Sequence, residues 1–276
     1  MPLTNLLVAY NGSDSSETAL QAALHLHQQH GGHLTGISAH AGQRDRFSRQ
    51  AWVPDTVRSM LDTAVAEDED RVQTRFREIV GNTVPEGQLH WISLYGQPDT
   101  TVAQYASLYD LTLVGRYDAV TGRDNMDVHP EHIALKSGRP VLMVPGALTE
   151  ALSTRTAVLA WDGHRAATRA INDATVLLGP DQLVQAITFG TRQVRPPLEG
   201  IDVAEALRRQ GLNAERVRKA EVQTSVGEDL LAHCAEIDAG LLIMGAFERS
   251  AFREELFGGP TKYILSHAEL PVLISH

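Results

Sequence analysis

The amino-acid sequence repeats its own order of features, and this internal repeat constrains the fold more than any other property. Residues 5–13 form an apolar run that closes on Asn11 and Gly12, and residues 156–164 form a similar run that closes on Asp162 and Gly163. Two further apolar runs stop at Gly115 and Gly245, and each half ends in an apolar strand that follows a proline. Because three landmarks recur in one order, the chain is predicted to contain two copies of one domain.

Strand and helix patterns alternate between these landmarks. Helices are expected at residues 14–29, 54–80, 98–108, 166–178, 199–210 and 226–237, and further strands at residues 33–39, 88–94, 182–189 and 214–223. In the long helix at 54–80, the predicted apolar side carries Val57, Met60, Leu61, Ala64 and Val65.

This alternation, with strands that are apolar on both faces, is typical of parallel sheets covered by helices on both sides. The sequence predicts an α/β protein with two tandem Rossmann-like domains, each a five-stranded parallel sheet. The domains are expected at residues 1–148 and 154–276, since a stretch with Pro, Gly, Ala and Ser lies between them.

Composition narrows the classes of partner. The 276 residues include 24 Lys and Arg against 34 Asp and Glu, and the net charge of −10 disfavours nucleic acid and anionic membranes as partners. No apolar run is long enough to span a bilayer, the N-terminus lacks a basic signal region, and a single cysteine fits a reducing compartment. We expect a cytoplasmic protein.

The candidate site of the second half lies after its first and fourth strands. In open α/β sheets, ligands bind beyond the carboxyl ends of the strands, where the strand order reverses. Asp162 and Gly163 follow the first strand, Gly245 ends the fourth, and Gly258 and Gly259 directly precede a helix. Free N–H groups at a helix start suit phosphate, and an ordinary ligand-free turn is the alternative.

These residues resemble the nucleotide loop of the universal stress protein family, whose ATP-binding members have two spaced glycines, then a glycine followed by Ser or Thr before a helix and a Pro-Val-Leu strand. Gly245 fits the first of these glycines and Gly258 the last. Glu248 replaces the second glycine, Gly259 stands at the Ser/Thr position, and Thr261 is expected to supply the hydroxyl. The resemblance covers essentially the whole chain, twice, and implies an adenine nucleotide alpha hydrolase-like fold. It also implies that the chain imitates the homodimer that single-domain relatives form, so that strands 140–145 and 271–276 meet and cover two sheet edges.

By the same resemblance, Asp162 contacts the nucleoside, Ile187 contacts adenine, and the ligand is ATP. Glu248 would repel a triphosphate by about 1–3 kcal/mol unless Mg²⁺ or Arg249 offsets its charge. A less charged ligand is the alternative.

The first half departs further from the family pattern. Asn11 replaces the aspartate, and residues 127–130, which match 258–261 when counted back from the final strand, contain no glycine pair. We interpret this half as a degenerate copy. His25, His27, His30 and His33, like His129 and His132, are interpreted as solvated residues rather than metal ligands, and Cys234 as a core residue rather than a nucleophile.

No catalytic set of residues emerges, so enzymatic activity is not expected. The leading hypothesis is a stress-response regulatory protein that binds adenine nucleotide in its second domain and acts on an unidentified protein partner, as a pseudo-dimeric monomer or a homodimer. The alternatives are a scaffold or chaperone-like protein with vestigial sites, and a slow ATPase or autophosphorylating protein.

Overall fold

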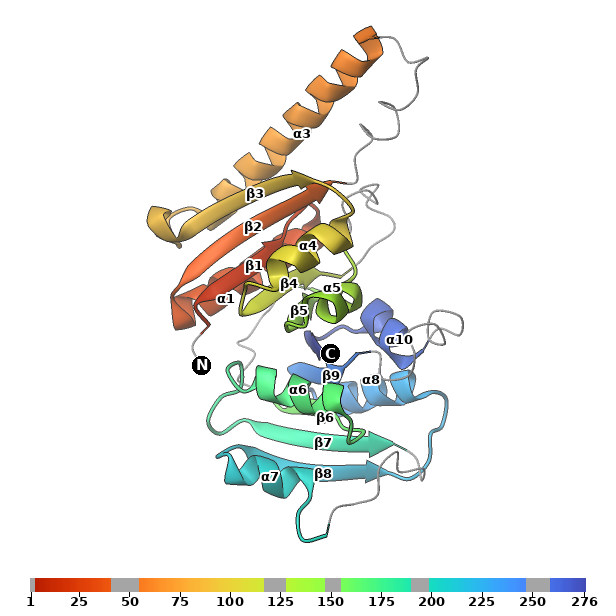
Figure 1. Cartoon of the computed structure of the whole chain (residues 1–276). Helices are drawn as coiled ribbons and strands as arrows, with labels where there is room; N and C mark the ends of the chain where they lie inside the picture. Colours follow the sequence, from red (N-terminus) through yellow and green to blue (C-terminus); the bar gives the residue numbers. More distant parts are fainter. Residues whose placement is uncertain (1–2, 41–54, 117–127, 147–154, 190–198, 247–258) are drawn as a thin grey trace.

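The computed structural model describes residues 3–40, 55–116, 128–146, 155–189, 199–246 and 259–276. Its strands form one ten-stranded sheet in the order β3-β2-β1-β4-β5-β10-β9-β6-β7-β8 (Figure 1). The strands of the first half are β1 (Asn5–Ala9), β2 (His33–His40), β3 (Leu89–Tyr95), β4 (Leu111–Gly115) and β5 (Val141–Val144). Those of the second half are β6 (Ala157–Ala160), β7 (Leu183–Phe189), β8 (Asn213–Lys219), β9 (Leu241–Gly245) and β10 (Val272–Ser275).

Each half is a five-stranded parallel sheet, which confirms the predicted fold class. Within each half the strand order reverses beside the first strand, between β1 and β4 and between β6 and β9. These two reversal points are where a doubly wound sheet binds its ligands.

Helices cover both faces of the sheet and divide the core in two. One apolar cluster takes its helical residues from α1 (Asp14–His30), α3 (Asp55–Val80), α6 (Arg165–Ala174) and α7 (Val203–Arg209). The other takes them from α4 (Pro98–Ala106), α5 (Pro130–Ser137), α8 (Val226–Glu236) and α10 (Pro260–His267). A short 3₁₀ turn, η1 (Glu86–Gln88), precedes β3. Strands buried between two helical layers explain the continuous apolar runs of the sequence.

The two half-sheets are joined by antiparallel pairing of β5 with β10, in which Leu142 lies opposite Leu273. The predicted meeting of the terminal strands is therefore confirmed. Residues 147–154 lie outside the described residues, so the domain boundary at 148 and 154 stays a prediction.

The long helix predicted at 54–80 is present as α3, but its predicted apolar side is wrong. Met60 is 72% exposed and Val57 is also exposed, whereas Val72, Phe76 and Val80 are buried. Figure 1 shows the reason: the first half of α3 extends beyond the sheet, and only its last turns pack on strands. An apolar stripe along a helix predicts burial only where the helix has a partner.

No helix among the described ranges is both long and apolar enough to cross a membrane.

The Asp110 side chain, directly before β4, forms hydrogen bonds to the start of β1. Its Oδ2 accepts hydrogen bonds from the backbone N–H of Thr4 at 2.8 Å, the Thr4 hydroxyl at 2.9 Å and the backbone N–H of Asn5 at 2.9 Å. Burial alone would raise the pKa of this carboxyl, but these hydrogen bonds outweigh burial and the pKa is lowered.

We expect Asp110→Ala to lower the free energy of unfolding by about 1–2 kcal/mol at neutral pH, because two backbone donors lose their acceptor. The folded-state pKa lies below the unfolded value, so this stabilisation is complete above the unfolded pKa and is lost as the pH falls through the folded pKa. Urea unfolding at neutral and acidic pH measures it, with Asp181→Ala at an exposed aspartate as control. An equal loss in both variants would contradict the role of Asp110.

Candidate functional site

The predicted nucleoside residue Asp162 lies in a tight turn at the strand-order reversal of the second half. The Trp161 N–H donates to the Ile187 carbonyl at 2.8 Å, which holds the end of the first strand beside β7. The Asp162 Oδ1 then accepts the N–H of His164 at 3.0 Å, and Gly163 adopts a φ of 79° that favours glycine. The Asp162 side chain is exposed at this carboxyl edge.

The first half builds the same turn from different residues. The Tyr10 N–H donates to the Ile37 carbonyl at 2.9 Å, the Asn11 Oδ1 accepts the N–H of Ser13 at 3.0 Å, and Gly12 has a φ of 76°. Asn11 is thus the structural counterpart of Asp162, and Ile37 is the counterpart of Ile187. Asparagine and aspartate close this turn equally well, so the turn alone does not explain the charge of Asp162.

Gly115 and Gly245 end the fourth strand of each half, and both have a packing role. A Cβ on Gly245 would lie 2.6 Å from the Ala166 Cβ and 2.7 Å from the Ala167 nitrogen, in the first turn of α6. A Cβ on Gly115 would collide with the backbone of Ser15 in the first turn of α1. The sequence analysis placed Gly245 in a nucleotide-binding loop. The structure shows that a helix lies against this glycine, and the ligand contact stays a prediction.

A pocket occupies the reversal point of the first half. It lies between the ends of β1 and β4, is partly open to solvent, and has an interior volume of about 20 Å³, room for roughly one water molecule. Apolar atoms of Ile37, Val102 and Val128 line it, together with polar groups of Asn11, Ser15 and Arg116. The half interpreted as degenerate therefore has a small amphipathic hollow at its reversal point.

The phosphate-binding residues predicted for the second half are described only in part. Glu248, Arg249 and Gly258 lie outside the described residues. Gly259 is the N-cap of α10 and has no side-chain cap, and Thr261 is 5% exposed in the first turn of that helix. Ile187 is 1% exposed within the apolar core.

The structure also corrects the comparison of the two helix starts. α5 begins at Pro130 and α10 at Pro260, so the N-cap His129 corresponds to Gly259. Counting back from the final strands had placed Val128 there instead, because the connection after α10 is one residue longer than that after α5.

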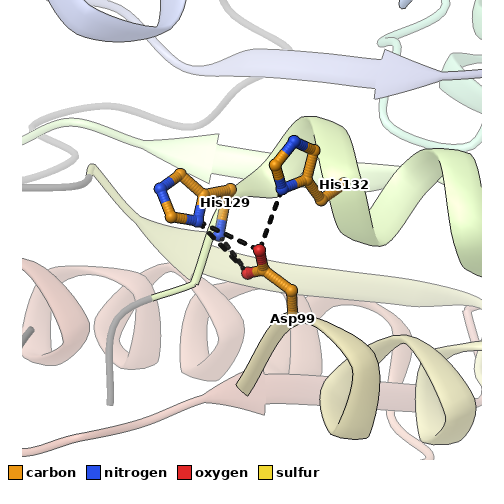
Figure 2. A group of neighbouring side chains, drawn as sticks. All are labelled: Asp99, His129 and His132. Atoms are coloured by element: carbon orange, nitrogen blue, oxygen red, sulfur yellow. Dashed lines mark hydrogen bonds and ion pairs between the residues drawn. The ribbon is translucent and has the colours of Figure 1, made fainter. Parts of the chain in front are cut away.

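Asp99, His129 and His132 form a side-chain cluster that the sequence did not predict (Figure 2). The Asp99 Oδ2 lies 2.9 Å from the His132 Nδ1 and 3.1 Å from the His129 Nδ1, while its Oδ1 accepts the backbone N–H of His129 at 2.7 Å. Burial would raise the pKa of Asp99, but the hydrogen bonds from both histidines hold it well below its usual range, and the bond to Asp99 raises the pKa of His132. The prediction that His129 and His132 are simply solvated is therefore wrong, because both imidazoles hydrogen-bond to Asp99. Their His-x-x-His spacing was the available signal in the sequence, but Asp99 lies about 30 residues away.

The remaining candidates are structural. His27 is 6% exposed, which corrects its interpretation as a solvated residue, and burial lowers its pKa. His33 lies on the sheet surface with its Nδ1 3.0 Å from the His90 Nε2. Cys234 is 2% exposed and burial raises its pKa to about 12, which confirms a core residue and leaves little reactive thiolate.

Solved structures with the same fold cover nearly the whole chain. A universal stress protein from Archaeoglobus fulgidus DSM 4304 aligns with a TM-score of 0.69 and 14% identity, over 98% of this chain and 95% of that chain. A functionally unknown protein from Pseudomonas aeruginosa PAO1 has a TM-score of 0.52 and 13% identity, over 99% of this chain and 92% of that one. A putative universal stress protein from Pseudomonas aeruginosa UCBPP-PA14 has a TM-score of 0.52 and 12% identity, over 99% and 93%.

At such low identity these likenesses show the fold alone. Comparison with curated proteins gives no sequence match. Residues 154–276 match the family model described as the Universal stress protein family. The C-terminal half of the chain therefore belongs to the universal stress protein family, and the N-terminal half repeats its five-stranded parallel fold.

Proposed function

We propose that the chain is a regulatory protein of the stress response that binds an adenine nucleotide, ATP with Mg²⁺, at the carboxyl edge of β6 and β9. The observation that supports this most directly is the exposed Asp162 carboxylate at the reversal point of the second half-sheet. Carboxylates accept hydrogen bonds from ribose hydroxyls at such points in other doubly wound folds.

The other parts of a nucleotide fit around this turn. In this proposal the base lies at the end of β6, beside the partly buried Trp161 and the backbone of Ile187, whose carbonyl accepts the Trp161 N–H. Within the described part of the chain no side chain caps the start of α10 at Gly259, so its first backbone N–H groups and the positive end of the helix dipole suit a phosphate. Gly258 and Arg249 would complete the phosphate contacts in this proposal, and Mg²⁺ would offset Glu248.

The pair Asp162 and Asn11 provides a matched test. Titration calorimetry of the full chain with ATP, ADP and AMP, with and without Mg²⁺, measures binding. Asp162→Ala should weaken binding by about 10–100-fold, because a charged hydrogen bond contributes about 1.5–3 kcal/mol. Asn11→Ala removes the same kind of turn from the other half and should leave the affinity unchanged.

The contrary outcomes are distinct. A loss of affinity in Asn11→Ala alone would place the nucleotide in the pocket of the first half, beside Arg116, and overturn the assignment to the second half. No saturable heat at millimolar nucleotide would overturn nucleotide binding and favour the scaffold alternative. Mg²⁺-dependent phosphate release that Asp162→Ala abolishes would replace a binding protein with a slow ATPase.

A further inference from the structure

We propose that Asp99, His129 and His132 form a binding site for Zn²⁺ in the first half. The three residues come from two helix starts: Asp99 lies in the first turn of α4, His129 is the N-cap residue of α5, and His132 lies in the first turn of α5 (Figure 2). α4 and α5 pack on the same face of the sheet, so the fold brings together residues that are distant in sequence.

The spacing of the donor atoms suits a tetrahedral ion. Two ligand atoms bound at about 2.0–2.1 Å in tetrahedral geometry lie about 3.3 Å apart. The Asp99 Oδ2 lies 2.9 Å from one imidazole Nδ1 and 3.1 Å from the other, and one ligand atom from each residue lies within 4.8 Å of the others. A zinc ion would replace the protons that Asp99 shares with the two imidazoles.

The carboxylate is already oriented for this role. Its Oδ1 accepts the backbone N–H of His129 at 2.7 Å, which leaves Oδ2 directed at the two imidazoles. Hydrogen bonds of this kind fix ligand carboxylates in metal sites. The Asp99 side chain is 10% exposed, whereas those of His129 and His132 are 41% and 40% exposed, so the site is closed on the carboxylate side and open to solvent on the imidazole side.

The donor set selects the class of metal. Two imidazoles and one carboxylate suit Zn²⁺ and its late first-row neighbours, whereas Mg²⁺ and Ca²⁺ take oxygen ligands. Three protein ligands and an open side leave a coordination position for water. The positive ends of the α4 and α5 dipoles oppose a cation, so we expect weaker binding than at four-ligand structural zinc sites.

The site borders the pocket of the first half without depending on it. Val128 precedes His129 in sequence, Val102 follows Asp99 on α4, and both line the pocket. The zinc proposal needs no nucleotide, and it goes beyond the function proposed for the second half.

Titration calorimetry of tag-free, chelator-treated full chain with ZnCl₂ alone tests the proposal. One tight equivalent is expected, and Co²⁺ at the same site should give the intense visible absorption of tetrahedral cobalt. His132→Gln retains a hydrogen-bonding group but removes a ligand, and should weaken the site by at least about 100-fold, since even changes behind the ligands cost about 10–100-fold.

His90→Gln is the matched control, because His90 forms the other close histidine pair, with His33, on the sheet surface. The His90→Gln variant should still bind one equivalent of Zn²⁺ tightly and should show the same Co²⁺ absorption. Absence of a tight site, unchanged binding in His132→Gln, or equal weakening in His90→Gln would overturn the proposal. Circular dichroism and thermal unfolding of His132→Gln check that the variant folds.

Discussion

Replacing Phe76 with alanine is expected to lower the free energy of unfolding by about 3–5 kcal/mol, because the ring is 0% exposed and leaves a cavity that the sheet cannot fill. The Phe76 side chain packs the last turns of α3 against β2 and β3. Its ring centroid lies 5.4 Å from that of Tyr10 and 4.9 Å from that of Trp91. Urea unfolding followed by circular dichroism measures the loss.

Gly36 in β2 makes room for this ring. A Cβ on Gly36 would lie 2.7 Å from atoms of both Phe76 and Trp91. Gly36→Ala should therefore destabilise the protein, and less so when Phe76 is already alanine, with a coupling of about 0.5–3 kcal/mol.

Met60→Ala is the control for Phe76→Ala, because Met60 lies on the same helix and is 72% exposed. Its effect should stay within about 0.5 kcal/mol. A comparable loss in both variants, or additivity of the Gly36 and Phe76 changes, would mean that α3 does not pack on β2 as described.

Leu273→Ala is expected to lower the free energy of unfolding by about 2–5 kcal/mol. Leu273 lies in β10 opposite Leu142 of β5, and both side chains are 0% exposed in one core cluster. Opposite residues of antiparallel strands share a face, so each leucine packs against the other across the joint between the halves.

Energetic coupling between the Leu142 and Leu273 substitutions is the specific test that β5 and β10 pack together. Leu142→Ala and Leu273→Ala should differ from additivity by at least about 0.5 kcal/mol, as contacting residues do. Leu108→Ala, at a leucine that is 75% exposed, provides the same substitution without burial. Strict additivity of the two β-strand variants would show that the halves do not meet through these strands.

The sequence alone determined the repeated α/β architecture. Local signals were sufficient because they are strong and close in the chain: apolar runs ending at Gly115 and Gly245, turns at Asn11 and Asp162, and helical periodicity between them. The meeting of the terminal strands was expected from the resemblance to a family whose single-domain members form homodimers, and it covers an edge that each half would otherwise expose.

Candidate residues were harder to interpret than elements. The sequence placed Asp162 at the reversal point correctly, but a glycine that ends a strand looks the same whether a ligand or a helix approaches it. Only the position of α6 against Gly245 showed a packing role. The exposed start of α3 likewise has the apolar pattern of a buried helix, and only the extent of the sheet decided which turns are covered.

The tertiary structure alone brought Asp99 to His129 and His132, and it alone formed a pocket in the half that the sequence marked as degenerate. The physical reason is the range of the interactions involved. Periodicity and turn chemistry act over a few residues and are written in the local sequence, whereas a donor cluster or a pocket depends on how helices from separate crossovers pack on one sheet. That packing is set by the summed contacts of the whole core.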